Sequence, residues 1–317
     1  MSVKEITIIA PEGMVAGGNT KGESFEYFNL VTGDKLGLSD NEAKNDKSWH
    51  IAFKRSFICI NSGPAGPGGV VGACIDPPVD VSREEFVTLT DYNWKQKFDA
   101  VKSIPDDAKL APEGIEPAIF GWRIEREGEW KAPVGKGWKV RCADGVGFAK
   151  MRVKEVDKNG ETISIQFAYQ REKDSKLGED KMAVIRPGES FSFKTGGVIE
   201  PSDIGWDIKH GGDKLYVNSS VSGPGSAGVI GSNKYGAKWK TIDNPSDSIA
   251  YFMDEYGAVF RTPKWYRYNI DGKHNIHPNG AVYGLQTAEG DFKVQVYDYF
   301  EHKGSDLGNI RVRYEKL

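Results

Sequence analysis

Apolar and polar residues alternate with a period of two along most of the chain, which is the pattern of β-strands with one buried face. The N-terminal part shows this pattern in EITIIA, SFEYFNLV, WHIAFKRSFICI, WKVRCA, AKMRVKEV and TISIQFAY, and the C-terminal part shows it in SFSFK, WDIKH, KLYVNS, AVYGLQT, FKVQVYDYF and IRVRYEK. Helical patterns are confined to residues 82–103 and to a short segment at 246–257, with Ser246 or Asp247 as its N-cap. The sequence therefore predicts an all-β protein with a minor helical part.

Asp-Gly, Asn-Gly and Glu-Gly pairs at 144–145, 159–160 and 289–290 separate several of these strands. Such dipeptides favour the backbone angles of tight hairpin turns. We therefore expect antiparallel sheets built from neighbouring strands.

A series of landmarks occurs twice, in the same order. Trp49 and Trp206 each begin a copy, an Asn follows twelve residues later, and a Gly-Pro-Gly loop ends in Gly-Val-x-Gly. The paired landmarks are Glu23-Ser24-Phe25 with Glu189-Ser190-Phe191, Asn61 with Asn218, Gly66-Pro67-Gly68 with Gly223-Pro224-Gly225, and, further along, Trp122 before CADGVGFAKMRV with Trp265 before TAEGDFKVQV. This order predicts two tandem β-rich domains, residues 1–173 and 180–317, with a boundary in the polar stretch at 170–181.

The composition excludes several classes of partner. A net charge of −3 with 27% charged residues gives no reason to expect nucleic acid or an anionic membrane. No run of eighteen apolar residues is present, so no transmembrane helix is expected. The first residues lack a basic segment followed by an apolar one, which fits a cytoplasmic protein or a mature form without its signal peptide.

Three cysteines lie in the first copy, at positions 59, 74 and 142, and the second copy has none. They allow a Cys59–Cys142 or a Cys59–Cys74 disulfide, or they are buried small hydrophobic residues. Their spacing is not that of a metal site.

The block from Trp49 to Gly72, with its alternating strand, Asn-Ser-Gly and Gly-rich loop, resembles the HmuY family of bacterial haem-binding proteins. The closing strands of each copy resemble that family as well. The resemblance implies an extracytoplasmic haemophore, either an outer-membrane lipoprotein, periplasmic or secreted. It also implies haem held in an apolar cleft by axial ligands from loops, and a TonB-dependent outer-membrane receptor as partner.

Haem iron takes one or two axial donors from the protein, such as His or Met. The family places one axial histidine shortly after the Trp of the Trp-x-x strand, where this chain has Glu127 and Ile270. The second copy offers His274 and His277 in the Gly-flanked loop IDGKHNIHPNG, and Met253 precedes them. These three residues are therefore the candidate axial ligands. The candidate pocket residues are the neighbouring aromatic side chains Tyr256, Trp265, Tyr266 and Tyr268.

The remaining motifs point away from other chemistries. His50, His210 and His302 are expected at the surface or in turns. The Gly-rich loop at 63–72 lacks the Lys-Ser/Thr of a P-loop, so its glycines are expected to allow close backbone approach rather than nucleotide binding. No Ser-His-Asp grouping or spaced carboxylate pair stands out, and no enzymatic activity is predicted.

Three functions fit this sequence. The first is non-catalytic binding of haem, or of a related iron-bearing or planar hydrophobic ligand, by the second copy for uptake. The second is binding of a ferric siderophore through aromatic and basic side chains. The third is a surface interaction module without a ligand that partners an outer-membrane receptor.

Overall fold

A computed structural model describes residues 2–9, 24–200, 204–231, 238–248, 250–300 and 309–317 of the protein. Strands dominate these residues, and the strand pairs within them are antiparallel. The described helices are three short α-helices and one 3-10 turn: α1 (Asp40–Ala43), α2 (Arg83–Phe86), α3 (Asp91–Ala100) and η1 (Trp239–Thr241). The predicted all-β class with a minor helical part is confirmed. No helix among these residues is both long and apolar enough to span a membrane.

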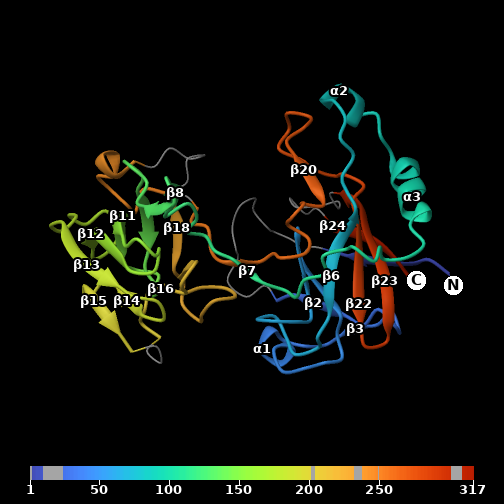
Figure 1. Cartoon of the computed structure of the whole chain (residues 1–317), viewed down its shortest axis with the longest axis horizontal. Helices are drawn as coiled ribbons and strands as arrows, with labels where there is room; N and C mark the ends of the chain where they lie inside the picture. The colour runs from blue at the N-terminus through green and yellow to red at the C-terminus, as the bar shows by residue number, and fades with distance from the viewer. Residues whose placement is uncertain (1, 10–23, 201–203, 232–237, 249, 301–308) are drawn as a thin grey trace. The chain divides into compact units, whose positions relative to one another are not determined.

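The chain divides into two compact units, but their limits differ from the predicted domains 1–173 and 180–317. Unit 1 combines Met1–Gly114 with Tyr256–Leu317, and unit 2 is the continuous segment Ile115–Glu255. In Figure 1, unit 1 therefore contains both the blue and the red ends of the chain. The polar stretch 170–181, predicted as the boundary, instead connects two paired strands inside unit 2.

Unit 1 contains two larger sheets and a hairpin. A four-stranded sheet has the order β3-β2-β4-β5, and a five-stranded sheet has the order β1-β24-β23-β22-β6. The strands are β1 (Lys4–Ile8), β2 (Glu26–Phe28), β3 (Lys35–Leu36), β4 (Ile51–Lys54), β5 (Phe57–Ile60), β6 (Val71–Asp76), β22 (Val282–Thr287), β23 (Gly290–Phe300) and β24 (Asn309–Lys316), and the hairpin is β20 (Tyr266–Tyr268) with β21 (Ile276–Pro278).

Unit 2 repeats this plan. Its four-stranded sheet has the order β15-β14-β16-β17, its five-stranded sheet has the order β13-β12-β11-β10-β18, and β8 pairs with β9 as a hairpin. The strands are β8 (Ile124–Arg126), β9 (Glu129–Lys131), β10 (Trp138–Arg141), β11 (Phe148–Val156), β12 (Ile163–Gln170), β13 (Lys181–Ile185), β14 (Ser190–Ser192), β15 (Gly197–Ile199), β16 (Ile208–His210), β17 (Leu215–Val217) and β18 (Gly228–Ile230). The short strands β7 (Ile115–Glu116) and β19 (Glu255–Tyr256) lie where the chain passes between units.

The strand register is the same in both units. The backbone N–H of Val70 donates to the carbonyl of Asn61, and the N–H of Ala227 donates to the carbonyl of Asn218. Gly72 and Val229, each two residues further on, are therefore structural counterparts, although the Gly-Val-x-Gly motif would have aligned Gly72 with Gly231. Gly72 lies opposite Leu285 on β22, and Val229 lies opposite Val140 on β10. Leu285 and Val140 are themselves equivalent, because each precedes the acidic-Gly turn of its repeat by four residues. Strands β1–β6 of the first repeat therefore fold with β22–β24 of the second, while β10–β12 of the first fold with β13–β18 of the second. The two sequence repeats have exchanged their C-terminal parts.

Each hydrophobic core contains side chains from both parts of its unit. In unit 1, Ile51 and Phe53 of the four-stranded sheet share a core with Leu285 and Val312 of the five-stranded sheet. In unit 2, Phe191 and Ile208 share a core with Trp138 and Phe167. Because each core requires both parts, the exchanged pieces are held by apolar burial as well as by hydrogen bonds.

Three local predictions need correction. The expected long strand at 49–60 is a hairpin, because Arg55 takes a left-handed φ of 55° and turns the chain between β4 and β5. The helical pattern at 82–103 gives two helices, α2 and α3, which start after Ser82 and Thr90. The expected helix at 246–257 is absent from its described residues, where Phe252 exchanges two backbone hydrogen bonds with Val229 as a β-bridge.

We predict that cutting the chain between β12 and β13 leaves the two fragments associated. A protease site inserted after Lys176, an exposed residue, would cleave unit 2, and each fragment would retain strands of both units. Size-exclusion chromatography of the cleaved protein should therefore show one peak with both fragments, which separate only in denaturant. Two peaks of free fragments under native conditions would contradict the exchanged arrangement.

Candidate functional site

An asparagine holds the Gly-Pro-Gly loop in unit 1. The side-chain amide of Asn61 donates to the carbonyl oxygens of Trp49 at 2.7 Å and Asp46 at 3.0 Å. Its Oδ1 accepts a hydrogen bond from the backbone N–H of Gly68 at 2.9 Å. The fully buried amide is thus satisfied at three positions, as a buried polar group requires.

Unit 2 has the same arrangement around Asn218. Its amide donates to the carbonyl oxygens of Ile204 and Trp206 at 2.7 and 2.8 Å, and its Oδ1 accepts from Gly225 N–H at 2.9 Å. A Cβ added to Gly66 or Gly223 would lie 2.2 Å from the Oδ1 of its asparagine, closer than real Cβ contacts come. The expected close backbone approach is confirmed, and it explains why the sequence repeats glycine here.

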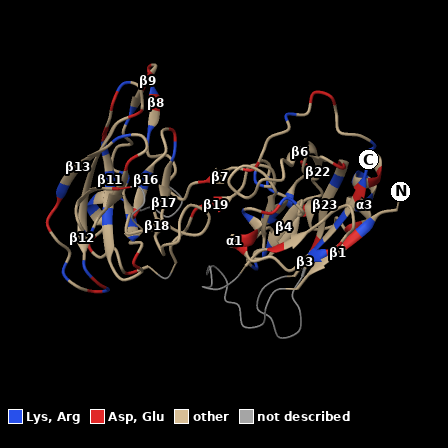
Figure 2. Cartoon of the chain, turned by 90° about the horizontal axis from the view of Figure 1, so that it is seen from below, with Lys and Arg blue, Asp and Glu red and all other residues tan. Residues whose placement is uncertain are grey.

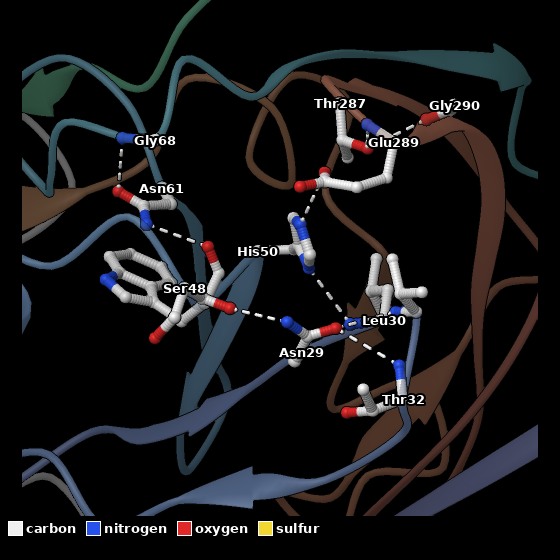
Figure 3. A network of polar contacts seen from close by, with 12 residues as sticks. Asn29, Leu30, Thr32, Ser48, His50, Asn61, Gly68, Thr287, Glu289 and Gly290 are labelled. Atoms are coloured by element: carbon white, nitrogen blue, oxygen red, sulfur yellow. Dashed lines mark hydrogen bonds and ion pairs between the residues drawn. The ribbon is translucent and has the colours of Figure 1, made fainter.

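The residue after each tryptophan is polar and buried, and it joins the two parts of its unit. Only 3% of His50 is exposed, so its expected surface position is wrong. His50 Nδ1 accepts the backbone N–H of Leu30 at 3.0 Å, and Nε2 lies 3.1 Å from Glu289 Oε2 in the turn between β22 and β23. Figure 3 shows this path from Leu30 through His50 to Glu289. With Nδ1 as an acceptor, the neutral ring donates through Nε2 to the carboxylate, and this bond lowers the pKa of Glu289.

Asp207 takes the equivalent position in unit 2. Its Oδ2 accepts the N–H of Phe193, and its Oδ1 accepts the N–H of Ala143, both at 2.7 Å. The backbone N–H groups of His50 and Asp207 donate to the carbonyls of Phe28 and Phe191 respectively. The structural counterpart of Phe191 is therefore Phe28 rather than Phe25.

Unit 1 has a buried carboxylate of its own, Glu113, which lies where the N-terminal part of the first repeat ends. Glu113 Oε2 accepts the N–H of Ile60 at 3.0 Å. Its Oε1 accepts N–H groups of Gly114, Gly257 and Ala258 at 3.0, 3.1 and 2.8 Å. One side chain thus connects β5 to the entry of the C-terminal segment.

Asp254 is the counterpart of Glu113 in unit 2. It accepts the N–H groups of Ala118 at 2.8 Å and Val217 at 2.9 Å. Val217 precedes Asn218 as Ile60 precedes Asn61, so the two carboxylates bind equivalent strand ends. Local sequence patterns do not single out Glu113, Asp207 or Asp254. The one available signal is that Asp207 follows Trp206 as His50 follows Trp49.

Burial raises the pKa of Asp207 and of Asp254 to about 6, although their backbone hydrogen bonds act in the opposite direction. Burial likewise raises the pKa of Glu113. Groups with perturbed pKa values are candidates for chemistry. Here each carboxylate oxygen accepts backbone N–H groups of packed segments, so the arrangement fits a structural role.

The predicted ligand loop forms the turn of hairpin β20–β21 in unit 1. His274 is exposed and has a left-handed φ of 61°, and its backbone N–H donates to Asn269 Oδ1 at 2.8 Å. Its Nδ1 lies 3.0 Å from the hydroxyl of Tyr268, whose side chain is 55% exposed. A phenol and an imidazole thus form a hydrogen-bonded pair at the surface.

His277 lies on β21, opposite Arg267 of β20. Its Nε2 is buried and lies 3.3 Å from Asp271 Oδ2. Hydrogen bonds from the backbone of Lys273 and from the side chain of Asn275, with the nearby His277 ring, lower the pKa of Asp271 to about 2. This contact with Asp271 is too poorly aligned to be a hydrogen bond, so the buried His277 Nε2 has no hydrogen-bond partner among the described residues.

The four predicted pocket aromatics do not share one environment. Trp265 and Tyr256 are core residues that donate to the carbonyl oxygens of Ser56 at 3.1 Å and Pro64 at 3.2 Å. Tyr266 packs edge-on against Trp265 with 4.8 Å between ring centroids, and Tyr268 points its hydroxyl at His274. Tyr266 and Tyr268 are thus the candidates that the hairpin itself carries.

Met253 lies in unit 2, whereas His274 and His277 lie in unit 1. The three predicted donors are therefore not brought together within one unit. Among the other histidines, His210 is fully buried rather than at the surface, with Nδ1 accepting the N–H of Gly212 at 3.0 Å. His302 lies outside the described residues.

All three cysteines are free. Cys59 and Cys142 are buried, and Cys74 is partly buried, so both proposed disulfides are absent and the interpretation as small hydrophobic residues holds. No group of three His, Cys, Asp or Glu side chains suited to a metal ion occurs within the described part of the chain. Neither the known protein-family models nor the curated proteins include a match to this chain.

We predict that Asn61→Ala and Asn218→Ala each destabilise their unit by about 2–4 kcal/mol, because each leaves buried backbone groups without partners. Asn29 is a matched control, since it also makes three side-chain hydrogen bonds but in an exposed setting. Urea unfolding should show a loss below about 1 kcal/mol for Asn29→Ala. Equal losses for Asn29→Ala and Asn61→Ala would contradict the argument.

We also predict that the Asp254 carboxyl makes unit 2 less stable as the pH rises from about 4 to about 7. Its folded pKa of about 6 lies above the ordinary pKa of 3.8 that an aspartate has in the unfolded chain, so the folded state binds more protons in this window. The stabilisation is complete below the unfolded pKa and is lost as pH rises through about 6, a change of about 3 kcal/mol.

Urea unfolding at pH 5.0 and 7.5, with amide protection in β12 as the readout for unit 2, tests this expectation. The stability difference between wild type and Asp254→Asn should shrink at pH 7.5. Asp157→Asn is the control, because the carboxyl of this exposed turn residue has a lowered pKa. A difference between wild type and Asp254→Asn that is independent of pH would refute the prediction.

Proposed function

We propose that the protein is a non-catalytic binding protein for haem or a related ferric ligand, and that hairpin β20–β21 provides the donors. The observation that carries this proposal is the contact of 3.0 Å between the Tyr268 hydroxyl and His274 Nδ1 on an exposed hairpin. Haem proteins use both His and Tyr as axial ligands. The resemblance of the Trp49–Gly72 block to the HmuY family supports the same class of ligand.

The phenol–imidazole pair provides two ways to bind ferric iron. The Tyr268 oxygen can bind as a phenolate, with its proton transferred to His274 Nδ1, or His274 can bind directly through Nε2. Among the described residues, His274 Nε2 has no hydrogen-bond partner. His277 is the second imidazole on the hairpin, but its Nε2 must leave Asp271 before it can bind iron. The proposal therefore ranks Tyr268 and His274 ahead of His277 and does not depend on Met253.

The surroundings of the pair add to the proposal. The hydrogen bonds that Asn269 and Asp271 accept from the backbone of the turn hold it in shape before a ligand arrives, which lowers the entropy lost on binding. Tyr266 on the same hairpin is an aromatic neighbour suited to a planar macrocycle. Capture of haem for uptake would place the protein outside the cytoplasm, with a TonB-dependent receptor as the partner that the resemblance implies.

We predict that added hemin gives a Soret band that saturates at one equivalent and that Tyr268→Phe and His274→Ala each weaken binding at least about tenfold, the effect of losing one ligand or its hydrogen-bond partner. His277→Ala should have the smaller effect. If Tyr268 is the ligand, the wild-type spectrum is that of a phenolate complex, and Tyr268→Phe abolishes this spectral signature.

Tyr92→Phe is a matched control, because Tyr92 is an exposed phenol on α3 in the same unit. It should bind hemin as the wild type does. A flat wild-type titration, or equal binding by Tyr268→Phe, His274→Ala and Tyr92→Phe, would contradict the proposal. A flat hemin titration combined with fluorescence quenching by a ferric catecholate would instead support siderophore binding.

A further inference from the structure

Strand β13 forms an edge of the five-stranded sheet in unit 2 that nothing covers within the described residues. The opposite edge of that sheet, β18, is capped by the bridge between Val229 and Phe252. In unit 1, β6 is the counterpart of β18, and it is likewise capped, by the bridge between Gly72 and Ala111. Among the residues that the structure describes, β13 pairs with β12 alone, so one side of its backbone has N–H and C=O groups without strand partners.

The outward face of β13 (Lys181–Ile185) is apolar, and a charged residue flanks the strand on each side. Met182 and Val184 are 56% and 46% exposed. Ile185, which alternation places on the opposite face of the strand, is buried. Asp180 and Arg186 lie immediately before and after the strand, at the positions that would continue the outward row if the strand alternation were extended. The Arg186 backbone N–H donates to Glu189 Oε2 at 2.7 Å, so Arg186 would contribute its side chain only. Exposed apolar residues on an open edge strand are unusual in a monomer, because such edges favour pairing with another strand.

The order of these four residues is self-complementary. If two copies of β13 pair in antiparallel orientation about Ala183, Asp180 lies opposite Arg186 and Met182 lies opposite Val184. The two-fold axis generates each pair twice, so the edge forms two ion pairs around four apolar side chains. Cross-strand pairs of opposite charge and of apolar side chains are both stabilising.

The flanking residues are compatible with this register. Lys181 would lie opposite Ile185 and would therefore face no like charge across the strands. Pro187, which has no N–H to donate, would lie opposite Glu179 and end the pairing. Asp180 Oδ2 accepts a hydrogen bond from Gln166 Nε2 at 2.9 Å, and its Oδ1 lies 3.5 Å from Lys150 Nζ. The guanidinium Nη1 of Arg186 lies 3.6 Å from Glu189 Oε1. These contacts leave the Arg186 side chain 66% exposed, so it is available for a second partner.

We propose that the protein associates with a second copy of itself through antiparallel pairing of β13, which joins two five-stranded sheets into one. The association is isologous, because the same residues contribute on both sides. One strand pair buries less area than a standard stable interface, so the dimer should be weak and depend on concentration. This inference is independent of haem binding.

Sedimentation velocity of the full chain over a range of concentrations tests the proposal. We predict a reversible monomer–dimer equilibrium whose dissociation constant rises at least about tenfold in Arg186→Asp, because two attractive cross-strand pairs become repulsive. Asp180→Arg should have the same effect. The double variant Asp180→Arg with Arg186→Asp restores opposite charges in both pairs and should recover dimerisation.

Arg171→Asp is the matched control, since it makes the same change of charge at an exposed residue outside β13. It should leave the dissociation constant unchanged, and circular dichroism should show that all variants remain folded. A wild-type chain that stays monomeric at every concentration would overturn the proposal. A dimer that Arg186→Asp does not weaken, or that the double variant does not recover, would overturn it as well.

Discussion

The arrangement of this chain depends on a buried carboxylate that joins distant segments. Glu113 accepts N–H groups from Ile60 on β5 and from Gly257 and Ala258, which lie 144 and 145 positions further along the chain. Removing it would leave several buried N–H groups without acceptors, each costing about 1–3 kcal/mol. Asp254 makes the corresponding connection in unit 2. In each unit, the carboxylate comes from the end of the N-terminal part of one repeat. It binds backbone N–H groups at the start of the C-terminal part of the other repeat.

The polar contacts do not by themselves select the exchanged arrangement. In unit 1, His50 of the first repeat faces Glu289 of the second. The residue that aligns with Glu289 in the first repeat is Asp144, another carboxylate, so an unexchanged unit would offer His50 a similar partner. Asp207 binds a backbone N–H of the turn, which any residue except proline supplies. The similarity of the repeats thus allows both arrangements, and the selection must come from the connecting segments and from core packing.

The sequence predicted the strands well because period-two alternation follows directly from one-sided burial, as in β10, β11 and β12. It predicted the close approach at Gly66 and Gly223 because two copies carried the same glycines. It failed where tertiary contacts decide. His50 and His210 are buried by segments far along the chain, and Phe252 forms a β-bridge in place of the helix that its local pattern favoured. The exchange was invisible, since a repeat pattern shows that two segments are alike and not which of them pair.

The two hairpins that follow Trp122 and Trp265 show how the copies have diverged. In unit 2, the Arg123 guanidinium lies 4.7 Å from the centre of the Trp122 ring and 4.2 Å from that of Trp130, and it donates to Gly160 O at 2.6 Å. In that hairpin, the aromatic rings thus pack against an arginine of the hairpin itself through cation–π contacts. The hairpin of unit 1 instead presents the Tyr268–His274 pair to solvent. The proposed ligand hairpin and the proposed dimer edge β13 thus belong to different units, so the sequence of one can change without disturbing the other, which is the freedom that a duplicated fold provides.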